Sequence, residues 1–276
     1  MPPLAARRTE ISAPLRLWHL TSLDAVTVAV TWTLAFAWAM HLSLPWWLPA
    51  VVGLSAWSFY IADRLVDAWR ARTPLRARHH FHWQHRRIFV PLAMVCGLCA
   101  LILVLWKMPV RIEMRDSLIA AAAVAYFAGV HTAERHKAQT SRKGLIRKEL
   151  LVALVFTSAC AAPALTRATN RLLLVPILLV FAALAWLNCY AIESWESGNA
   201  PLVRYAARWL ACGALLLACF TVLLHQERIA LLLLAAAASA TLLALLNRNR
   251  EQLSPLALRA LADLVLLPPI VLLALR

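Results

Sequence analysis

Residues 57–70 read WSFYIADRLVDAWR, a stretch in which an apolar segment becomes charged within two helical turns. Its two carboxylates, Asp63 and Asp67, are four residues apart, so a helix presents both of them on one face. A basic run follows and contributes arginines and histidines: Arg72, Arg76, Arg78, Arg86, Arg87, His79, His80, His82 and His85. Two acids that face many bases at the end of an apolar helix indicate a polar site at the edge of an apolar region.

The composition indicates a membrane protein. The chain has 276 residues, of which 62% are hydrophobic and 6 are glycine, and its mean hydropathy is +0.70. A soluble domain is roughly half apolar. The net charge of +15 comes from bases in short loops between apolar runs, where such residues set membrane topology and contact anionic lipids or a phosphorylated ligand. We therefore expect membrane lipids and no nucleic acid as partners.

The apolar runs predict nine transmembrane helices. A helix crosses a bilayer with roughly 20 apolar residues, and this length gives the spans 22–43, 46–66, 88–107, 116–132, 148–166, 171–191, 203–224, 229–246 and 256–275. Pro268 and Pro269 are expected to kink the last of them. The expected fold is an all-α integral membrane protein, with a single membrane domain, 21–276, after a cytoplasmic N-terminal segment, 1–20.

The orientation follows from the lysines and arginines. With nine spans, 21 of the 28 basic residues fall on the side that holds the N-terminus and the loops after the even-numbered spans. Because cytoplasmic loops carry an excess of these residues, we expect the N-terminus in the cytoplasm and the C-terminus outside. The first span is too long for a signal peptide and lacks a small-residue cleavage site. The expected location is the inner (cytoplasmic) membrane, which the chain crosses several times.

A second acidic segment ends the sixth predicted span. Residues 188–196 read NCYAIESWE, and Asn188 and Glu196 lie about two helical turns apart on roughly one face, with Glu193 offset from it. Polar groups at the edge of a span are costly and commonly functional. The predicted topology brings this segment to the same membrane side as Asp63 and Asp67. Two interpretations stay open, namely helix ends stabilised by ion pairs and two acidic ends that face a shared cavity.

Nine spans with acidic motifs after the second and the sixth resemble the UbiA superfamily of intramembrane prenyltransferases. The first motif of that family reads roughly N-D-x-x-D-x-x-x-D and falls on residues 59–67, where Asp63 and Asp67 match and Phe59-Tyr60 replaces Asn-Asp. The second, usually D-x-x-x-D, falls on residues 192–196, where Glu196 is acidic and Glu193 is one residue out of place. The stretch Lys148-Glu149 is also similar to the family. The resemblance covers nearly the whole chain by topology, and about half of each motif is present.

The resemblance implies transfer of an isoprenoid group from an allylic diphosphate to a lipid-soluble, commonly aromatic, acceptor. Mg²⁺ is the implied cofactor and bridges the two acidic motifs. The implied metal ligands and catalytic groups are Asp63, Asp67, Glu193 and Glu196. The implied substrate-binding residues are Arg64, Arg72, Arg142, Lys143, Lys148, Tyr60, Asn188 and Tyr190.

Other polar residues lie near the ends of the predicted spans. Asp24, near the start of the first span, has no local partner, so we expect it to pair across helices or to face the cavity as a proton acceptor or an acceptor contact. Arg259 and Asp263 are four residues apart and predict an ion pair. The four histidines match no zinc-ligand spacing and are expected in a flexible basic loop that contacts lipid phosphates or a diphosphate.

Two other functions remain open. Because the acidic motifs are incomplete, one alternative is a non-catalytic relative that binds a lipid or a partner protein. The other is a membrane transporter, a class that commonly has internal repeats and helices broken at mid-membrane. The sequence shows no such repeat, and its acids gather toward one membrane face.

Overall fold

The computed structural model describes residues 9–71, 76–108, 142–196 and 201–275, without the side chains of 142–148 and 201. Every regular element in these ranges is a helix, and an isolated bridge joins Thr9 to Leu253. The helices are α1 (Ala13–Leu20), α2 (Leu23–Ala39), α3 (Trp47–Arg70), α4 (Ala77–Gln84), α5 (Arg86–Lys107), α7 (Arg142–Arg167), α8 (Val175–Glu196), α9 (Pro201–Leu223), α10 (Glu227–Arg248), α11 (Pro255–Leu264) and α12 (Pro269–Ala274), with 3₁₀ turns at Arg171–Leu174 and Arg250–Gln252.

The described helices confirm an all-α, multi-pass membrane protein. Five stretches are long and apolar enough to cross a bilayer, and there are six if α1 and α2 count as one bent span. The five are Arg86–Lys107, Glu149–Arg167, Arg171–Glu196, Leu202–Leu223 and Glu227–Arg248. α3 is long, but its last two turns carry the charged residues of the first acidic motif. The fourth predicted span, 116–132, lies outside the described residues, so nine spans and their orientation stay predictions.

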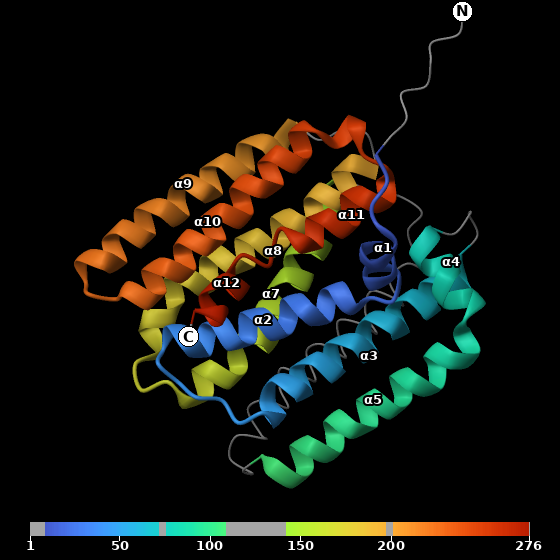
Figure 1. The fold of residues 1–276 in the computed structure, drawn as a ribbon, viewed down its shortest axis with the longest axis horizontal. Coiled ribbons are helices and arrows are strands. Elements are labelled where there is room, and N and C mark those ends of the chain that lie inside the picture. The colour runs from blue at the N-terminus through green and yellow to red at the C-terminus, as the bar shows by residue number, and fades with distance from the viewer. Residues whose placement is uncertain (1–8, 72–75, 109–141, 197–200, 276) are drawn as a thin grey trace, which may run out of the picture.

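Helix α2 lies in the middle of the bundle (Figure 1) and packs against α3, α7, α10, α11 and α12. Its Trp32 is fully buried and stacks on Phe181 of α8, with ring centroids 4.0 Å apart. In lipid, where apolar burial drives helix association only weakly, such close packing holds helices together. α2 and α3 also approach closely at Gly53, where an added Cβ would lie 3.1 Å from a methyl group of Val30.

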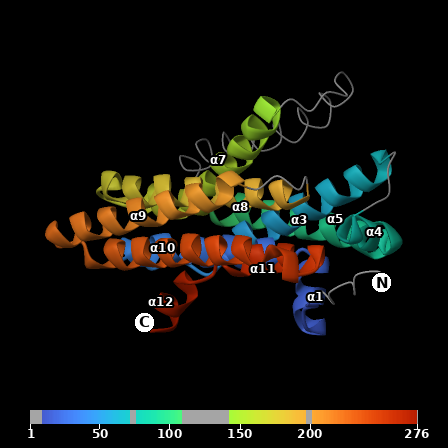
Figure 2. The same cartoon turned by 90° about the horizontal axis from the view of Figure 1, so that it is seen from above.

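The stretch 256–275, which the sequence analysis treats as the last span, is two short helices. α11 ends at Leu264, and α12 begins at Pro269 and turns away from the layer of α10 and α11 (Figure 2). The adjacent prolines cannot donate backbone hydrogen bonds, so the carbonyls of Leu264 and Val265 lose their α-helical donors. The Leu266 carbonyl also leaves the α-helical pattern, because the Ile270 N–H donates to Leu267. It accepts a hydrogen bond from the indole of Trp32 instead, 2.9 Å away. The kink is confirmed, but the break is larger than expected and divides the helix.

Two segments outside the predicted spans are helical and packed. The predicted N-terminal segment contains α1, which is bent by 82° from α2. The bend occurs at Ser22, whose φ of 60° is left-handed. The histidine-rich run was expected to be a flexible loop, and this was wrong, because it forms α4 with His79 and His82 buried. α4 packs against α1, α3 and α5.

Candidate functional site

The helix ends that carry most of the described ion pairs lie at one end of the bundle, at the right of Figure 1. This charged end consists of α1, α4, α11, the first turn of α2 and the C-terminal turns of α3 and α8. α1 packs against α2, α4 and α11, and α11 packs against α8. Both acidic motifs therefore end in the same region of the structure.

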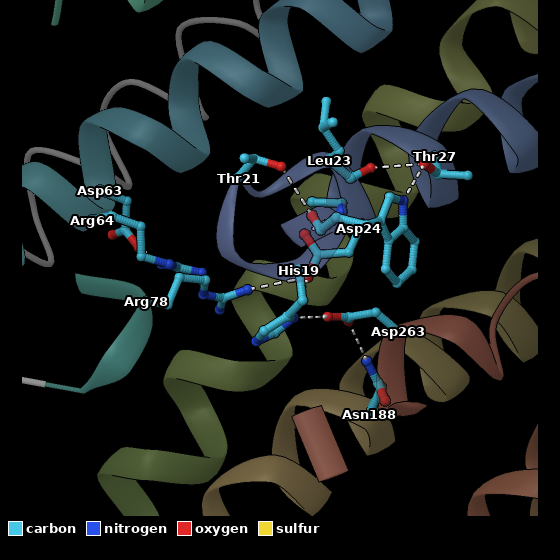
Figure 3. Close-up of polar contacts among 12 residues, drawn as sticks. His19, Thr21, Leu23, Asp24, Thr27, Asp63, Arg64, Arg78, Asn188 and Asp263 are labelled. Carbon is cyan, nitrogen blue, oxygen red and sulfur yellow. Dashed lines mark hydrogen bonds and ion pairs between the residues drawn. The ribbon is translucent and has the colours of Figure 1, made fainter. Parts of the chain in front are cut away.

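A buried polar cluster lies inside the charged end (Figure 3). Nδ1 of His19 is 2.6 Å from a carboxylate oxygen of Asp24 and 3.7 Å from one of Asp263. The guanidinium of Arg78 lies 3.3 Å from the same oxygen of Asp24. The amide of Asn188 donates to Asp263 across 3.3 Å. Five helices thus each contribute one polar side chain to this cluster.

The local structure around Ser22 places the two central groups of this cluster. The left-handed turn ends α1 and starts α2, so His19 and Asp24 come from helices that diverge sharply. Asp24 lies in the first turn of α2, where its other oxygen accepts a hydrogen bond from the backbone N–H of Ala25 at 2.8 Å. A carboxylate is favoured there by the unpaired N–H groups and by the helix dipole. The prediction that Asp24 has no local partner was wrong, because His19, five residues before it, contacts its carboxylate.

The acids of the first motif both contact bases. Asp63 forms an ion pair with Arg64, whose guanidinium also lies over the ring of Tyr60 at 5.4 Å from the ring centroid. Asp67 accepts from Nε2 of His79 at 3.3 Å. The side chain of Arg64 is buried although the two carboxylates are partly exposed.

The acids of the second motif contact two arginines. Arg76, which directly precedes α4, lies 2.6 Å from Glu196 and 3.5 Å from Glu193. Glu196 also pairs with Arg259 of α11. The predicted partner of Arg259 was Asp263, and among the described contacts Arg259 pairs with Glu196 instead. Arg76 therefore links the chain after α3 to the acidic end of α8.

The buried histidines of α4 favour the neutral form. Burial lowers the pKa of His82 to about 4, and a hydrogen bond to the backbone of Arg78 opposes part of this shift. Burial also lowers the pKa of His79, although its hydrogen bond to Asp67 acts in the opposite direction. Nδ1 of His82 donates to the Arg78 carbonyl at 2.9 Å. This last bond lies within α4, whereas the contact of His79 with Asp67 of α3 and the packing of the His82 ring on Phe89 of α5 hold α4, with Arg78, against its neighbours.

The fit of Mg²⁺ can be tested on the four motif acids. Carboxylate oxygens suit Mg²⁺ chemically, but all four acids contact bases in this structure. Within the described ranges, the acidic, histidine and cysteine side chains that come within 4.8 Å of one another as a group of three are His19, Asp24 and Asp263. Arg78 and the short His19–Asp24 contact already occupy Asp24. The structure thus presents no preformed ligand set at the motif acids, and their role as metal ligands stays a prediction.

The remaining predicted binding residues are distributed more widely. Asn188 belongs to the buried cluster, and Tyr60 lies beside Arg64. Tyr190 is buried in an apolar cluster with residues of α9, α10 and α11. Arg72 lies outside the described residues, as do the side chains of Arg142, Lys143 and Lys148, which belong to the first turns of α7.

An open apolar groove of about 500 Å³ lies on the side of the bundle. It lies between α2, α3 and α5, and its lining runs from Leu23, adjacent to Asp24 in the chain, to Val30 and Pro49. Trp57 lines the groove near the charged end and donates its indole N–H to the Thr21 carbonyl at 2.9 Å. The groove thus offers an apolar surface between three helices of the bundle.

Comparison with known proteins gives no further identification. No family model, curated protein or solved structure matches the chain. The likeness to the UbiA superfamily consequently rests on the motifs and predicted topology of the chain itself.

Proposed function

We propose that this membrane protein is an intramembrane prenyltransferase that transfers an isoprenoid group from an allylic diphosphate to a lipid-soluble, aromatic acceptor. The observation that carries the proposal is the contact of Arg76 with Glu193 and Glu196. Through it, the segment after the first acidic motif reaches the second motif. A diphosphate site of this class requires both motifs at one end of the helices, beside an apolar surface for the isoprenoid chain.

Two arginines support the binding of a diphosphate. The Nε–H groups of Arg64 and Arg78 are buried, and neither has a hydrogen-bond partner among the described residues. Burial and then the neighbouring charge of Arg64 lower the pKa of Arg78. Two guanidinium groups that repel one another and retain unpaired donors suit a phosphate anion, which guanidinium binds with several hydrogen bonds.

The apolar groove supports the isoprenoid half of the donor. Its lining begins at Leu23 and Trp57, close to the charged end, and continues along α2 and α3. A donor with its diphosphate at Arg64 and Arg78 would place its chain against this surface. Membrane lipid can enter the same open groove, so both the donor and a lipid-soluble acceptor have access from the bilayer.

The chemistry follows from the placement of positive charge. When the allylic C–O bond breaks, negative charge develops on the leaving diphosphate, and fixed guanidinium groups in a dry site stabilise it. Tyr60, under Arg64, presents an aromatic ring next to the same position, and such rings attract a cation. Asp63 and Asp67 orient Arg64 and His79. Mg²⁺ dependence, nine spans and a cytoplasmic charged end in the inner membrane are further parts of the proposal.

A transfer assay tests the proposal. The purified protein is reconstituted in lipid nanodiscs with Mg²⁺, a labelled allylic diphosphate and aromatic lipid-soluble acceptors, and both free diphosphate and prenylated product are measured. The proposal expects product with the wild type and with Arg171→Gln, which alters an exposed arginine in the 3₁₀ turn before α8. It expects a loss of about 100-fold or more with Arg78→Gln, by analogy with removal of a group that stabilises developing charge.

A non-catalytic relative is the second candidate. It is favoured by the contact of all four motif acids with basic side chains, since carboxylates already held by such partners are poor metal ligands. This alternative predicts that a prenyl diphosphate binds equally well with and without Mg²⁺ and is recovered unchanged. Binding that strictly requires Mg²⁺, or any turnover, contradicts it.

A further inference from the structure

The buried cluster of the charged end contains two carboxylates, Asp24 and Asp263, but one permanently charged base, Arg78, because His19 is charged only when protonated. Asp24 is fully buried, and 19% of the Asp263 side chain is exposed. The described ion pairs bring one guanidinium, that of Arg78, to these carboxylates. If both were ionised and His19 were neutral, the cluster would carry a net negative charge in a site with little solvent. Such a charge is expensive without compensation.

A bound proton removes this imbalance. Nδ1 of His19 lies between the two carboxylates, at 2.6 Å from Asp24 and 3.7 Å from Asp263. An imidazolium at this position faces both acids, and a protonated Asp263 can still accept the hydrogen bond from Asn188 through its carbonyl oxygen. Because the three groups interact closely, the proton belongs to the cluster and not to one residue.

Arg78 connects this cluster to the buried donors that are proposed to bind an anion. One of its terminal nitrogens lies 3.3 Å from Asp24, whereas its Nε–H is buried without a partner, as is that of Arg64. Arg78 therefore balances the negative charge of Asp24 and also retains an unpaired Nε–H, as Arg64 does. A ligand that binds Arg78 changes the field at Asp24.

We propose that binding of a diphosphate at Arg64 and Arg78 is coupled to uptake of a proton from solvent by His19, Asp24 and Asp263. This inference rests on the proposed function, which supplies the diphosphate as the anion. Negative charge placed beside Arg78 weakens its compensation of Asp24, and the carboxylates and imidazole then bind protons more tightly. Asp263 is the partly exposed member of the cluster and the point where the proton exchanges. The reaction involves no covalent step.

Within the described part of the chain, Arg78 is the cation that contacts Asp24. The titratable and charged groups around the cluster are His19 of α1, Asp24 of α2, Tyr60 and Arg64 of α3, Arg78 of α4, Glu149 of α7, Cys189 of α8, and Arg259 and Asp263 of α11. Arg259 pairs with Glu196, and Arg64 pairs with Asp63. Because Arg78 is the cation in contact with Asp24 among these described groups, an anion that binds Arg78 directly reduces the positive charge that the cluster experiences.

Calorimetry on the full chain tests the coupling. The protein in nanodiscs is titrated with inorganic diphosphate at pH 7 in two buffers of different ionisation enthalpy, which yields the protons taken up per bound diphosphate. Free diphosphate itself titrates near neutrality, so the wild type is compared with Asp263→Asn and with His19→Gln. Binding by each variant shows that its site is folded. A third comparison, Arg171→Gln, changes an exposed arginine outside the charged end.

The expected result is an excess of up to one proton per diphosphate in the wild type and in Arg171→Gln, of which more than half is lost in Asp263→Asn and His19→Gln. As a consequence, wild-type affinity falls with rising pH by up to about tenfold per pH unit more than that of the variants. Equal proton uptake by wild type and both variants would overturn the coupling and leave the proposed function intact. If inorganic diphosphate and an allylic diphosphate both fail to bind the wild type, the proposed function and the coupling fail together.

Discussion

Acidification is expected to destabilise the charged end through His82. This side chain is fully buried on α4, its ring packs on Phe89 at 4.5 Å between centroids, and burial lowers its pKa to about 4. A histidine in the unfolded chain titrates near 6.5. Because the folded pKa is the lower one, the unfolded state binds more protons as the pH falls. The stability is therefore complete above about pH 6.5 and decreases as the pH falls toward 4.

The magnitude follows from the two pKa values. Between pH 7.5 and pH 5, the unfolded imidazole becomes almost fully protonated while the folded one stays mostly neutral. Linkage then gives a loss of about 2 kcal/mol of unfolding free energy from this group. The loss matters for function, because α4 carries Arg78 and follows Arg76.

Thermal unfolding in detergent, followed by helical circular dichroism at both pH values, measures this effect. The control variant His82→Phe keeps a ring against Phe89 but cannot titrate, so its melting temperature should fall less on acidification than that of the wild type. His80→Phe, at an exposed position of the same helix, should behave like the wild type. The same acid-induced decrease in wild type and in His82→Phe would refute the reasoning.

Three further predictions concern packing and the acidic motifs. Gly53→Val should destabilise the fold by about 1–3 kcal/mol, because the new side chain would push α2 away from α3 at Val30. Gly213→Ala is the control, since a Cβ at that position meets nothing within 4 Å. Equal melting temperatures for both variants would contradict the packing argument. The double change of Asp63→Asn with Asp67→Asn should lower prenyl transfer by about 10–100-fold, as loss of groups that orient a site does, and unchanged turnover of a folded double variant would exclude the proposed roles. Removal of Mg²⁺ with a chelator should abolish transfer, and transfer that persists would remove Mg²⁺ from the account.

The membrane class could be predicted because a long apolar segment in a bilayer must pair its own backbone groups, and a helix does this. The helices α5, α8, α9 and α10 lie close to the predicted spans 88–107, 171–191, 203–224 and 229–246. The positions of Pro268 and Pro269 also indicated where the last helix is disturbed. Hydropathy reports whether a segment is apolar, but it does not report whether neighbouring helices can accommodate a complete break.

The buried cluster could be anticipated only in part. Asp24 was noticed because an acid in an apolar segment is costly, and Asn188 because it belongs to the second acidic segment. His19 was missed because its contact with Asp24 depends on the left-handed turn at Ser22, for which serine gives no strong signal. Arg78 was hidden among many similar bases. Arg78 reaches the buried cluster only because α4 forms and packs against its neighbours. Spacing rules do not describe the tertiary packing that makes the histidines of α4 helical and buried.

The central claim is that the charged end binds an allylic diphosphate. Equilibrium binding of labelled farnesyl diphosphate to the protein in nanodiscs tests it most directly, with the wild type compared with Arg78→Gln and with Arg171→Gln. The account predicts saturable binding to the wild type, unchanged binding to Arg171→Gln and a decrease of at least about tenfold with Arg78→Gln, in line with about 1.5–3 kcal/mol for a charged hydrogen bond. Equal binding to wild type and Arg78→Gln, or no saturable binding to the wild type, would contradict it.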